Sequence, residues 1–309
     1  MTQSSNPWLR IGTRGSPLAL AQAFEVRKRL AVAHGVDPDS IAVQTIRTSG
    51  DVIVDRPLAE VGGKGLFTKE IEQALFGCHV DLAVHSAKDM ETALPQGLVI
   101  AAVLPREDVR DAFISRKAAT LAELPGGAVV GTASLRRQAI LRRLRPDLRV
   151  VSLRGNVETR LKKLDAGEVD ATLLALAGLK RLGLADAATA VFSVEEFLPA
   201  VGQGAIAIET RERDGRTRDL LAPLNDDATM VALTAERALL AALDGSCRTP
   251  IAGHAAVAGD VLMLRARIVK PDGSAEHATT RAGAVNDAAA LGRDAGAELK
   301  ARAGPGFFA

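Results

Sequence analysis

The chain of 309 residues has the composition of an ordinary globular protein, with 47% apolar and 25% charged residues. This composition excludes a mainly disordered chain, and the length suffices for two or three domains that bury cores without disulfide bonds. The cysteines are Cys78 and Cys247, and no apolar run approaches the roughly 20 residues that a membrane helix needs. Because the first ten residues lack the pattern of a secretory signal, we expect a cytoplasmic protein without a membrane partner.

Positive charge gathers in one part of the chain, although the whole chain carries a net charge of only +2. Residues 131–181 hold twelve basic and five acidic side chains. Aromatic residues make up only 3% of the chain, so the stacking platforms that usually accompany single-stranded nucleic-acid binding are missing. We therefore expect these cations to bind a small polycarboxylate or phosphate and expect no nucleic-acid partner.

Strand, turn and helix alternate along the first two thirds of the chain, which predicts two α/β domains. The first series of expected elements is strand 9–13, helix 17–34, strand 41–47, helix 66–76 and strands 80–85 and 98–104. The second series is strand 128–131, helix 134–145, strand 149–153, helix 157–164 and strand 171–175.

The connection between the two series and the end of the chain depart from this alternation. Residues 105–108 and 111–116 are expected to form a crossover, and the late apolar strand 205–209 is expected to return to the first sheet. After Pro223, a long helical stretch, three alternating strands and an alanine-rich helix predict a third, α+β domain. The predicted domains are residues 1–104 plus 205–222, residues 105–204, and residues 223–309.

The segment 131–137 is the strongest local sign of an anion site. Ser134 suits a helix N-cap, yet Arg136 and Arg137 follow in the first turn, where cations oppose the helix dipole. A bound carboxylate or phosphate would reverse this penalty, because backbone N–H groups and guanidinium groups would both face it. The alternative is a pair of solvated charges at a helix start.

Charged residues also follow the expected strands of both series. Arg154, Arg160 and Arg181 lie at or after strand ends, where open α/β sheets bind their ligands. Lys88 and Asp89 follow the strand that ends at residue 85, and this pair could bind an anion, handle protons and stabilise a cationic intermediate. For each of these residues alone, a surface charge or surface ion pair is the alternative.

Two glycine-rich segments do not match nucleotide-binding motifs. In the first, Gly65 follows Lys64 where a Walker A loop has Ser or Thr, and Leu58 stands where that loop has its first glycine. In the second, Gly202 and Gly204 lack the third glycine of a dinucleotide fingerprint. We therefore assign no nucleotide cofactor, and we assign no metal site.

The two cysteines have different surroundings. Cys247 lies in a polar loop beside Arg248, after a helix that Gly245 terminates, which makes it a candidate for thiolate chemistry or covalent attachment. An inert loop cysteine is the alternative. Cys78 ends a helical stretch beside apolar neighbours and is interpreted as a packing residue.

Together these segments resemble the porphobilinogen deaminase, or hydroxymethylbilane synthase, family across nearly the whole chain. The matching segments, in the order and spacing of the family, are 13–19, 61–67, 85–89, 131–138, 152–156, 177–182, 199–204 and the loop around Cys247. The resemblance implies a fold of two periplasmic-binding-protein-like α/β domains with a third, smaller α+β domain. It also implies a monomer.

The resemblance implies a transferase of tetrapyrrole, and hence porphyrin and haem, biosynthesis. Such an enzyme joins four porphobilinogen molecules head to tail into 1-hydroxymethylbilane and releases ammonia from each. The family carries a dipyrromethane cofactor, which the resemblance places on Cys247 through a thioether bond. It also implies that Asp89 is the catalytic aspartate and that Lys64 and Phe67 belong to the same catalytic site.

The remaining family site residues fall on cations and small polar residues. Those that would bind the cofactor carboxylates are Ser86, Lys88, Thr132, Ser134, Arg136, Arg137, Arg154 and Arg160. Those that would bind the incoming substrate or the growing chain are Arg14, Ser16, Arg181 and Gln203. Departures from the family pattern are Glu60, Ala87, Ala133 and the absence of proline from residues 90–92.

Two other classes of function compete with this interpretation. Two α/β domains joined by two crossovers are also the architecture of non-catalytic anion-binding proteins of the periplasmic type, and the fold alone does not separate them. The basic segment 131–181 is also compatible with a nucleic-acid binder, whose affinity would fall steeply with salt.

Overall fold

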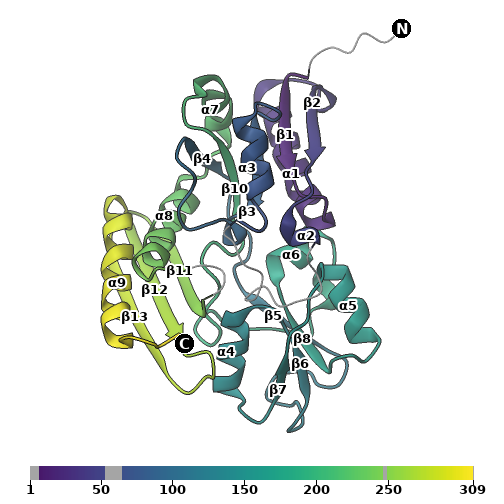
Figure 1. The fold of residues 1–309 in the computed structure, drawn as a ribbon, viewed down its shortest axis with the longest axis vertical. Coiled ribbons are helices and arrows are strands. Elements are labelled where there is room, and N and C mark those ends of the chain that lie inside the picture. Colours follow the sequence, from purple (N-terminus) through teal and green to yellow (C-terminus); the bar gives the residue numbers. More distant parts are fainter. Residues whose placement is uncertain (1–6, 53–64, 246–248, 309) are drawn as a thin grey trace.

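The computed structural model describes residues 7–52, 65–245 and 249–308. Within these residues the strands form two five-stranded sheets and one three-stranded sheet, each with its own helices (Figure 1). The predicted architecture of two α/β units and a smaller α+β unit is therefore confirmed, whereas the residue boundaries given above for the domains stay predictions. None of the helices in this part of the chain combines the length and the apolar character that a membrane span needs.

The first sheet has the strand order β2-β1-β3-β10-β4. Its strands are β1 (Leu9–Thr13), β2 (Ile41–Thr45), β3 (Leu82–Ser86), β4 (Leu98–Val103) and β10 (Ile206–Arg211). Strand β1 pairs in parallel with β2 and β3, whereas β10 pairs antiparallel with β3 and β4. The late strand thus returns to the first sheet, as predicted. The helices of this part of the chain are α1 (Pro17–His34), α2 (Ser49–Val52), α3 (Lys69–Phe76) and α7 (Gly215–Leu221).

The second sheet has the strand order β7-β6-β8-β5-β9. Its strands are β5 (Asp111–Ser115), β6 (Val129–Gly131), β7 (Arg149–Val151), β8 (Ala171–Ala175) and β9 (Ala190–Val191). Its helices are α4 (Leu135–Leu144), α5 (Val157–Asp165) and α6 (Leu176–Arg181). The prediction of a crossover at residues 111–116 was wrong, because residues 111–115 form a strand that is buried at every position.

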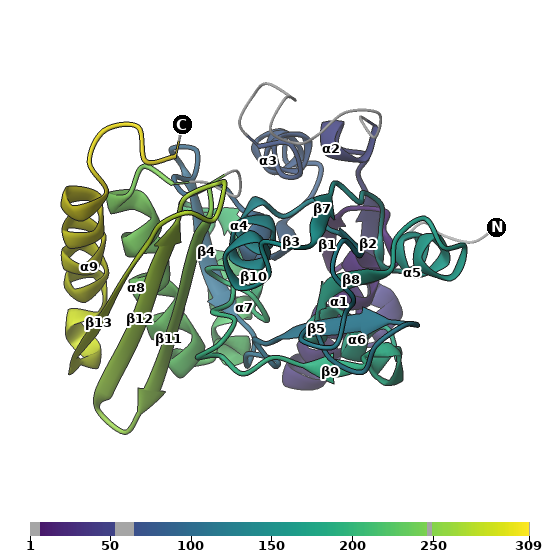
Figure 2. The ribbon, with the colours of Figure 1, turned by 90° about the horizontal axis from the view of Figure 1, so that it is seen from below.

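The third sheet is an antiparallel meander covered by two helices (Figure 2). Its elements are α8 (Asp227–Ala242), β11 (Ile251–Ala258), β12 (Val261–Val269), β13 (Glu276–Ala284) and α9 (Ala288–Ala303). Alternate residues of β12 join a common core with α8 and α9. Gly292 of α9 allows the two helices to approach closely, because a Cβ atom at this position would lie only 2.1 Å from the carbonyl oxygen of Ala235 on α8.

Side-chain caps fix where several helices start. Ser16 precedes Pro17 and accepts a hydrogen bond from the backbone N–H of Ala19, which suits the first turn of α1. Ser134 and Asn156 cap α4 and α5 in the same way. Because all three caps follow parallel strands at short intervals, the helix starts lie at the carboxyl ends of the sheets.

Cys78 follows α3 in a turn and is exposed. Its φ angle of 54° is left-handed, so the chain turns away from the helix there. The interpretation of Cys78 as a packing residue was therefore wrong.

One buried carboxylate joins the third unit to both connections between the first two sheets. Glu236 of α8 has no exposed surface and accepts hydrogen bonds of 2.6 and 3.0 Å from the guanidinium group of Arg106. It also accepts 2.7 Å bonds from the backbone N–H groups of Gly202 and Ala255. Arg106 lies in the connection after β4, Gly202 in the one before β10, and Ala255 in β11.

We expect Glu236→Gln to destabilise the fold by about 3–5 kcal/mol, because the change leaves Arg106 as a buried charge and turns an amide NH₂ toward backbone donors. Chemical denaturation measures the free energy of unfolding. The matched control is Asp165→Asn in the exposed pair with Arg116, for which we expect a change within about 1 kcal/mol. A loss below about 1 kcal/mol for Glu236→Gln would show that this junction does not support the fold.

Candidate active site

A small cavity lies where β1 and β3 end. Its lining includes five residues that the sequence analysis placed in or beside the site, namely Arg14, Ser16, Phe67, Ser86 and Asp89. Its volume is about 50 Å³. Two predicted site residues, Lys64 and Cys247, lie outside the described residues.

Arg14 is held from two sides in this cavity. Its guanidinium carbon lies 4.3 Å from the centroid of the Phe67 ring, a cation–π contact. The same group forms an ion pair with Asp51, with a distance of 3.1 Å between Nε and Oδ1. Burial raises the pKa of Asp51, but the bonds from Arg14 and Thr48 outweigh burial and lower it. The sequence analysis did not identify Asp51 as a partner of Arg14.

The end of β3 is fixed by two further contacts. The side-chain nitrogen and oxygen of Gln22 lie 2.9 and 3.0 Å from the hydroxyl oxygen of Ser86. Nε2 of His85 lies 3.1 Å from a carboxylate oxygen of Glu209 on β10, and both side chains are buried. Gln22 also lines the cavity, and sequence reasoning missed it because it lies on the otherwise apolar inner face of α1.

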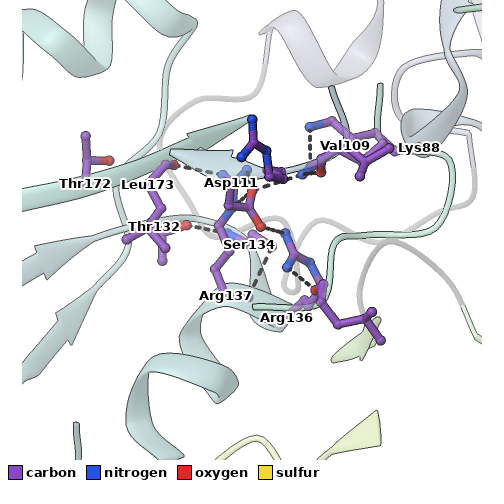
Figure 3. Close-up of polar contacts among 12 residues, drawn as sticks. Lys88, Val109, Asp111, Thr132, Ser134, Arg136, Arg137, Thr172 and Leu173 are labelled. Carbon is purple, nitrogen blue, oxygen red and sulfur yellow. Dashed lines mark hydrogen bonds and ion pairs between the residues drawn. The ribbon is translucent and has the colours of Figure 1, made fainter. Parts of the chain in front are cut away.

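In the second unit, Asp111 pairs with both arginines of the first turn of α4 (Figure 3). Oxygen–nitrogen distances are 2.7 Å to Nη2 of Arg136 and 2.6 Å to Nη2 of Arg137. Nη1 of Arg136 donates to the carbonyl of Leu198 at 2.7 Å, and Nη1 of Arg137 donates to Leu173 at 2.8 Å. The sequence predicted a bound anion at this helix start, and in the structure the carboxylate of Asp111 pairs with these two arginines instead.

The charge state of Asp111 follows from these contacts. Burial alone would raise the pKa of Asp111, but the charges and hydrogen bonds of Arg136 and Arg137 outweigh it and lower the pKa to about 2. Asp111 is therefore ionised at neutral pH. Both guanidinium groups are almost fully buried, with 4% of each residue exposed, so neither is the solvated surface charge of the alternative interpretation.

Gln203 joins the two units through its side-chain amide. Its Nε2 donates to the carbonyl of Val109 at 2.7 Å and to the carboxylate of Asp111 at 3.1 Å. Its Oε1 accepts from Nζ of Lys88 at 3.3 Å. Lys88 follows β3 of the first sheet and Asp111 begins β5 of the second, so one amide links both sheets.

Lys88 lies in a region of excess positive charge. Burial lowers the pKa of Lys88 to about 8, and the positive charges of Arg137 and Arg136 add to this effect. The carboxylates of Asp89 and Asp111 act in the opposite direction but do not cancel it. An anion placed beside Lys88 would raise this pKa, because it would favour the charged form.

Arg160 responds to the same surroundings. Burial lowers the pKa of Arg160 to about 10, as do the nearby charges of Arg137 and Arg154, whereas Asp89 raises it. Its Nε donates to the carbonyl of Gly155 at 2.7 Å, which directs the guanidinium group back toward the end of β7. Arg137, Arg154 and Arg160 therefore lie close enough to Asp89 or to one another to interact.

Thr132 and Ser134 shape the start of α4. The hydroxyl of Thr132 accepts from the N–H of Ser134 at 3.3 Å, and the hydroxyl of Ser134 accepts from the N–H of Arg137 at 3.4 Å. Thr132 is buried, and Ser134 is the N-cap. Both residues are placed to direct the first turn of α4 and its arginines.

Arg181 lies apart from these residues. Its Nη2 donates to the carbonyl of Gly204 at 2.9 Å, and its Nε lies 3.8 Å from the carboxylate of Glu25 on α1. Burial lowers the pKa of Arg181, whereas Glu25 and Glu107 raise it, so its electrostatic partners are not those of Lys88 and Arg160. The structure does not bring Arg181 into the lining of the cavity.

The end of α8 approaches the loop that carries Asp89. The hydroxyl of Thr92 donates to the carbonyl of Gly245 at 2.7 Å. Thr92 follows Asp89 by three residues, and Gly245 precedes the segment 246–248. The third unit therefore contacts the candidate site beside the predicted cofactor loop.

Taken together, this arrangement can bind several carboxylates and can stabilise a positive charge beside Asp89. Lys88, Arg154 and Arg160 supply cations, and Asp89 also lines the cavity that contains Arg14. Among the described residues, no group of three or more His, Cys, Asp or Glu side chains is arranged to hold a metal ion.

Comparisons with known proteins agree over nearly the whole chain. The family model described as "Porphobilinogen deaminase, dipyromethane cofactor binding domain" matches residues 9–219, and the model of the porphobilinogen deaminase C-terminal domain matches residues 230–301. The porphobilinogen deaminases of Nitrobacter hamburgensis and Nitrobacter winogradskyi are each 64% identical over 298 residues, which cover 96% of this chain and 94% of the relative.

Among solved structures, a nutrient binding protein from Burkholderia cenocepacia bound to methionine is 16% identical, with a TM-score of 0.44. The similar region covers 69% of this chain and 90% of that protein. The two family models together, and each of the two relatives, match this sequence over almost its full length. On that ground, the chain belongs to the porphobilinogen deaminase family.

Proposed function

We propose that the protein is a transferase that condenses four porphobilinogen molecules into 1-hydroxymethylbilane and releases ammonia from each, with dipyrromethane as its primer. One observation carries this proposal: Lys88 and Arg160 interact electrostatically with Asp89 in a chain whose residues 9–219 match the dipyrromethane cofactor-binding domain of the family. A non-catalytic anion-binding protein is not favoured, because residues 230–301 also match the enzyme family.

The described residues fit a cofactor that carries several carboxylates. Burial lowers the pKa of both Lys88 and Arg160, and neighbouring cations lower it further, so a carboxylate beside either group would stabilise its charged form. When bound, dipyrromethane supplies the free pyrrole position to which each new unit is joined. Lys88, Arg154 and Arg160 would hold its carboxylates, with Ser86, Thr132 and Ser134 as polar partners.

Arg136 and Arg137 would act in the same cofactor site through the hydrogen-bonding groups that Asp111 leaves available. Asp111 fixes both guanidinium groups before any ligand binds, so little conformational entropy is lost when a carboxylate arrives. Their charges would also act at short range through the buried surroundings.

Asp89 would stabilise the positive charge that develops on the pyrrole ring of porphobilinogen as ammonia leaves. Its carboxylate lines the cavity that also contains Arg14 and Ser16, so a substrate in that cavity would contact all three. Arg14 and Ser16 would bind the substrate carboxylates, with Phe67 holding the Arg14 guanidinium group. Lys64 would complete the catalytic set.

Gln203 and Arg181 would act on the substrate or the growing chain. For Gln203, the contact with Lys88 supports a role beside the bound chain. For Arg181, the contact with Gly204 supports a role in holding the connection that contains Gln203. The proposal also includes a monomer in the cytoplasm, as expected from the sequence and the family resemblance.

Cys247 would anchor the cofactor. The hydrogen bond between Thr92 and Gly245 supports this proposal, because Gly245 is two residues from Cys247, or at most about 7 Å of extended chain. The anchor would then start within reach of the Asp89 loop.

We expect Cys247→Ser to leave a folded protein without a covalent adduct and with little activity, because a hydroxyl does not form the thioether. The matched control is Cys78→Ser, at the exposed thiol outside the site, which should keep both the adduct and the activity. Mass spectrometry of the denatured proteins gives the added mass. An added mass that persists in Cys247→Ser would contradict the anchor assignment.

We expect Asp89→Asn to reduce turnover by roughly 100-fold or more, because the change removes the charge but preserves the size of the side chain. Cofactor loading should survive, so intact mass should match that of the wild type. Asp39→Asn, at an exposed carboxylate in a weak pair with Arg27, is the control and should leave kcat unchanged. Near-normal turnover of Asp89→Asn at saturating porphobilinogen would leave Asp89 with only a structural role.

A further inference from the structure

The two residues Glu91 and Thr92 contact three separate parts of the molecule. Oε1 of Glu91 accepts a hydrogen bond of 2.6 Å from the backbone N–H of Gly65. Thr92 donates through its hydroxyl to the carbonyl of Gly245 at 2.7 Å. Nη2 of Arg237 on α8 donates to the carbonyls of both residues, each at 2.9 Å. No role was assigned to either side chain by the sequence analysis or by the family resemblance.

Through Gly65, Glu91 acts on the turn that carries Phe67. Gly65 has a φ angle of 71°, which favours glycine, and its carbonyl accepts from the N–H groups of Thr68 and Lys69 at 3.1 and 2.9 Å. Phe67 lies inside this turn, with its ring against the guanidinium group of Arg14. A carboxylate that fixes Gly65 therefore also fixes the aromatic support of Arg14.

Through Gly245, Thr92 acts on the end of α8. The N–H of Gly245 donates to the carbonyl of Leu240 at 2.9 Å, and a Cβ atom at this position would lie 2.3 Å from Cδ1 of Ile251. The packing around this position excludes a side chain, so only the backbone groups of Gly245 can hold it in place. The hydrogen bond from the hydroxyl of Thr92 connects the carbonyl of Gly245 to the loop that carries Asp89.

Arg237 connects the Glu91 contact and the Thr92 contact, because it binds the backbone of both residues. Its bonds to successive carbonyls hold the backbone of Glu91 and Thr92 against α8. Burial lowers the pKa of Arg237, whereas the charge of Glu209 on β10 acts in the opposite direction, so the first sheet supplies an electrostatic partner of this guanidinium group. The loop after Asp89 thus lies between the substrate cavity and the end of α8.

We propose that Glu91 and Thr92 are positioning residues with separate effects. Glu91 positions the Phe67 turn, and with it Arg14, for substrate binding. Thr92 positions Gly245, and with it the start of the cofactor loop, for attachment of the primer. This inference rests on the proposed function, because it assigns the two contacts to the substrate side and the cofactor side of that site.

The test compares a disruptive and a conservative variant at each position. Glu91→Ala removes the acceptor for Gly65, and Glu91→Gln keeps an oxygen there. Thr92→Val removes the hydroxyl at nearly constant volume, and Thr92→Ser keeps it. Matched controls are Glu123→Ala, which loses a carboxylate bond to the N–H of Ala119, and Thr234→Val, which loses a hydroxyl bond to the carbonyl of Met230.

Expected results separate the two residues. Glu91→Ala should raise KM for porphobilinogen about 3- to 10-fold with kcat within about 2-fold and with full cofactor mass, and Glu91→Gln should restore most of the loss. Thr92→Val should lower the fraction of chains that carry the cofactor at least about 2-fold when apo-protein is loaded for a limited time, and Thr92→Ser should restore it. Both controls should match the wild type.

A readout independent of activity accompanies these measurements. Hydrogen exchange at the Gly65 amide should be about 10-fold faster in Glu91→Ala than in the wild type and unchanged in Thr92→Val. Unchanged exchange at Gly65, or KM and cofactor fractions equal to those of the controls, would overturn the inference. The inference would also be overturned if Glu91→Ala and Thr92→Val changed KM, the cofactor fraction and hydrogen exchange alike, in proportion to their loss of stability in chemical denaturation. A wild type that carries no added mass and consumes no porphobilinogen would instead contradict the proposed function.

Discussion

The buried carboxylate of Asp111 is the interaction on which the rest of the site depends. A charge without contact to water is costly unless partners replace the lost hydration, and two guanidinium groups and the amide of Gln203 do so here. In return, Asp111 holds Arg136 and Arg137 in the first turn of α4, where the helix dipole disfavours cations. Through Gln203 the same carboxylate also orients Lys88, which belongs to the other sheet.

This arrangement leaves a surplus of positive charge among the residues that interact with Asp89. One carboxylate pairs with two arginines, and Lys88, Arg154 and Arg160 add further positive charge. Burial lowers the pKa of Lys88 and that of Arg160, and neighbouring cations lower both further. A ligand with several carboxylates relieves this surplus, which an uncharged ligand does not. The surplus charge therefore favours a polyanion in the region where the proposed chain grows by carboxylate-bearing units.

The sequence predicted the elements whose signals are local. Ser134 was predicted as an N-cap because it precedes a helical stretch after an apolar strand, and the structure confirms it as the cap of α4, whose first turn contains Arg136 and Arg137. The strand predicted at residues 205–209 was also expected to return to the first sheet, and the pairing of β10 with β3 confirms this. Predictions at Lys64 and Cys247 lie outside the described residues and stay predictions.

Features that depend on distant partners were not predictable in this way. Asp111 begins a buried strand, but a charged residue after a polar segment looks like part of a crossover until Arg136 and Arg137 are placed beside it. Gln22 and Asp51 carry no motif, and their roles depend on contacts with Ser86 and Arg14 that span tens of residues. The exposure of Cys78 depends on a left-handed turn that no apolar pattern signals.

The pKa of Lys88, with and without cofactor, tests most directly the claim that surplus charge in this site binds carboxylates. Lysine side chains labelled with ¹⁵N can be titrated by NMR in the wild type and in Cys247→Ser, with Lys88→Arg used for assignment. Without cofactor, Lys88 should be charged below a pKa of about 8 and should lose its proton as the pH rises through that value. With cofactor bound, the pKa should be higher, because a neighbouring carboxylate favours the charged form. The same pKa in both proteins would contradict the claim.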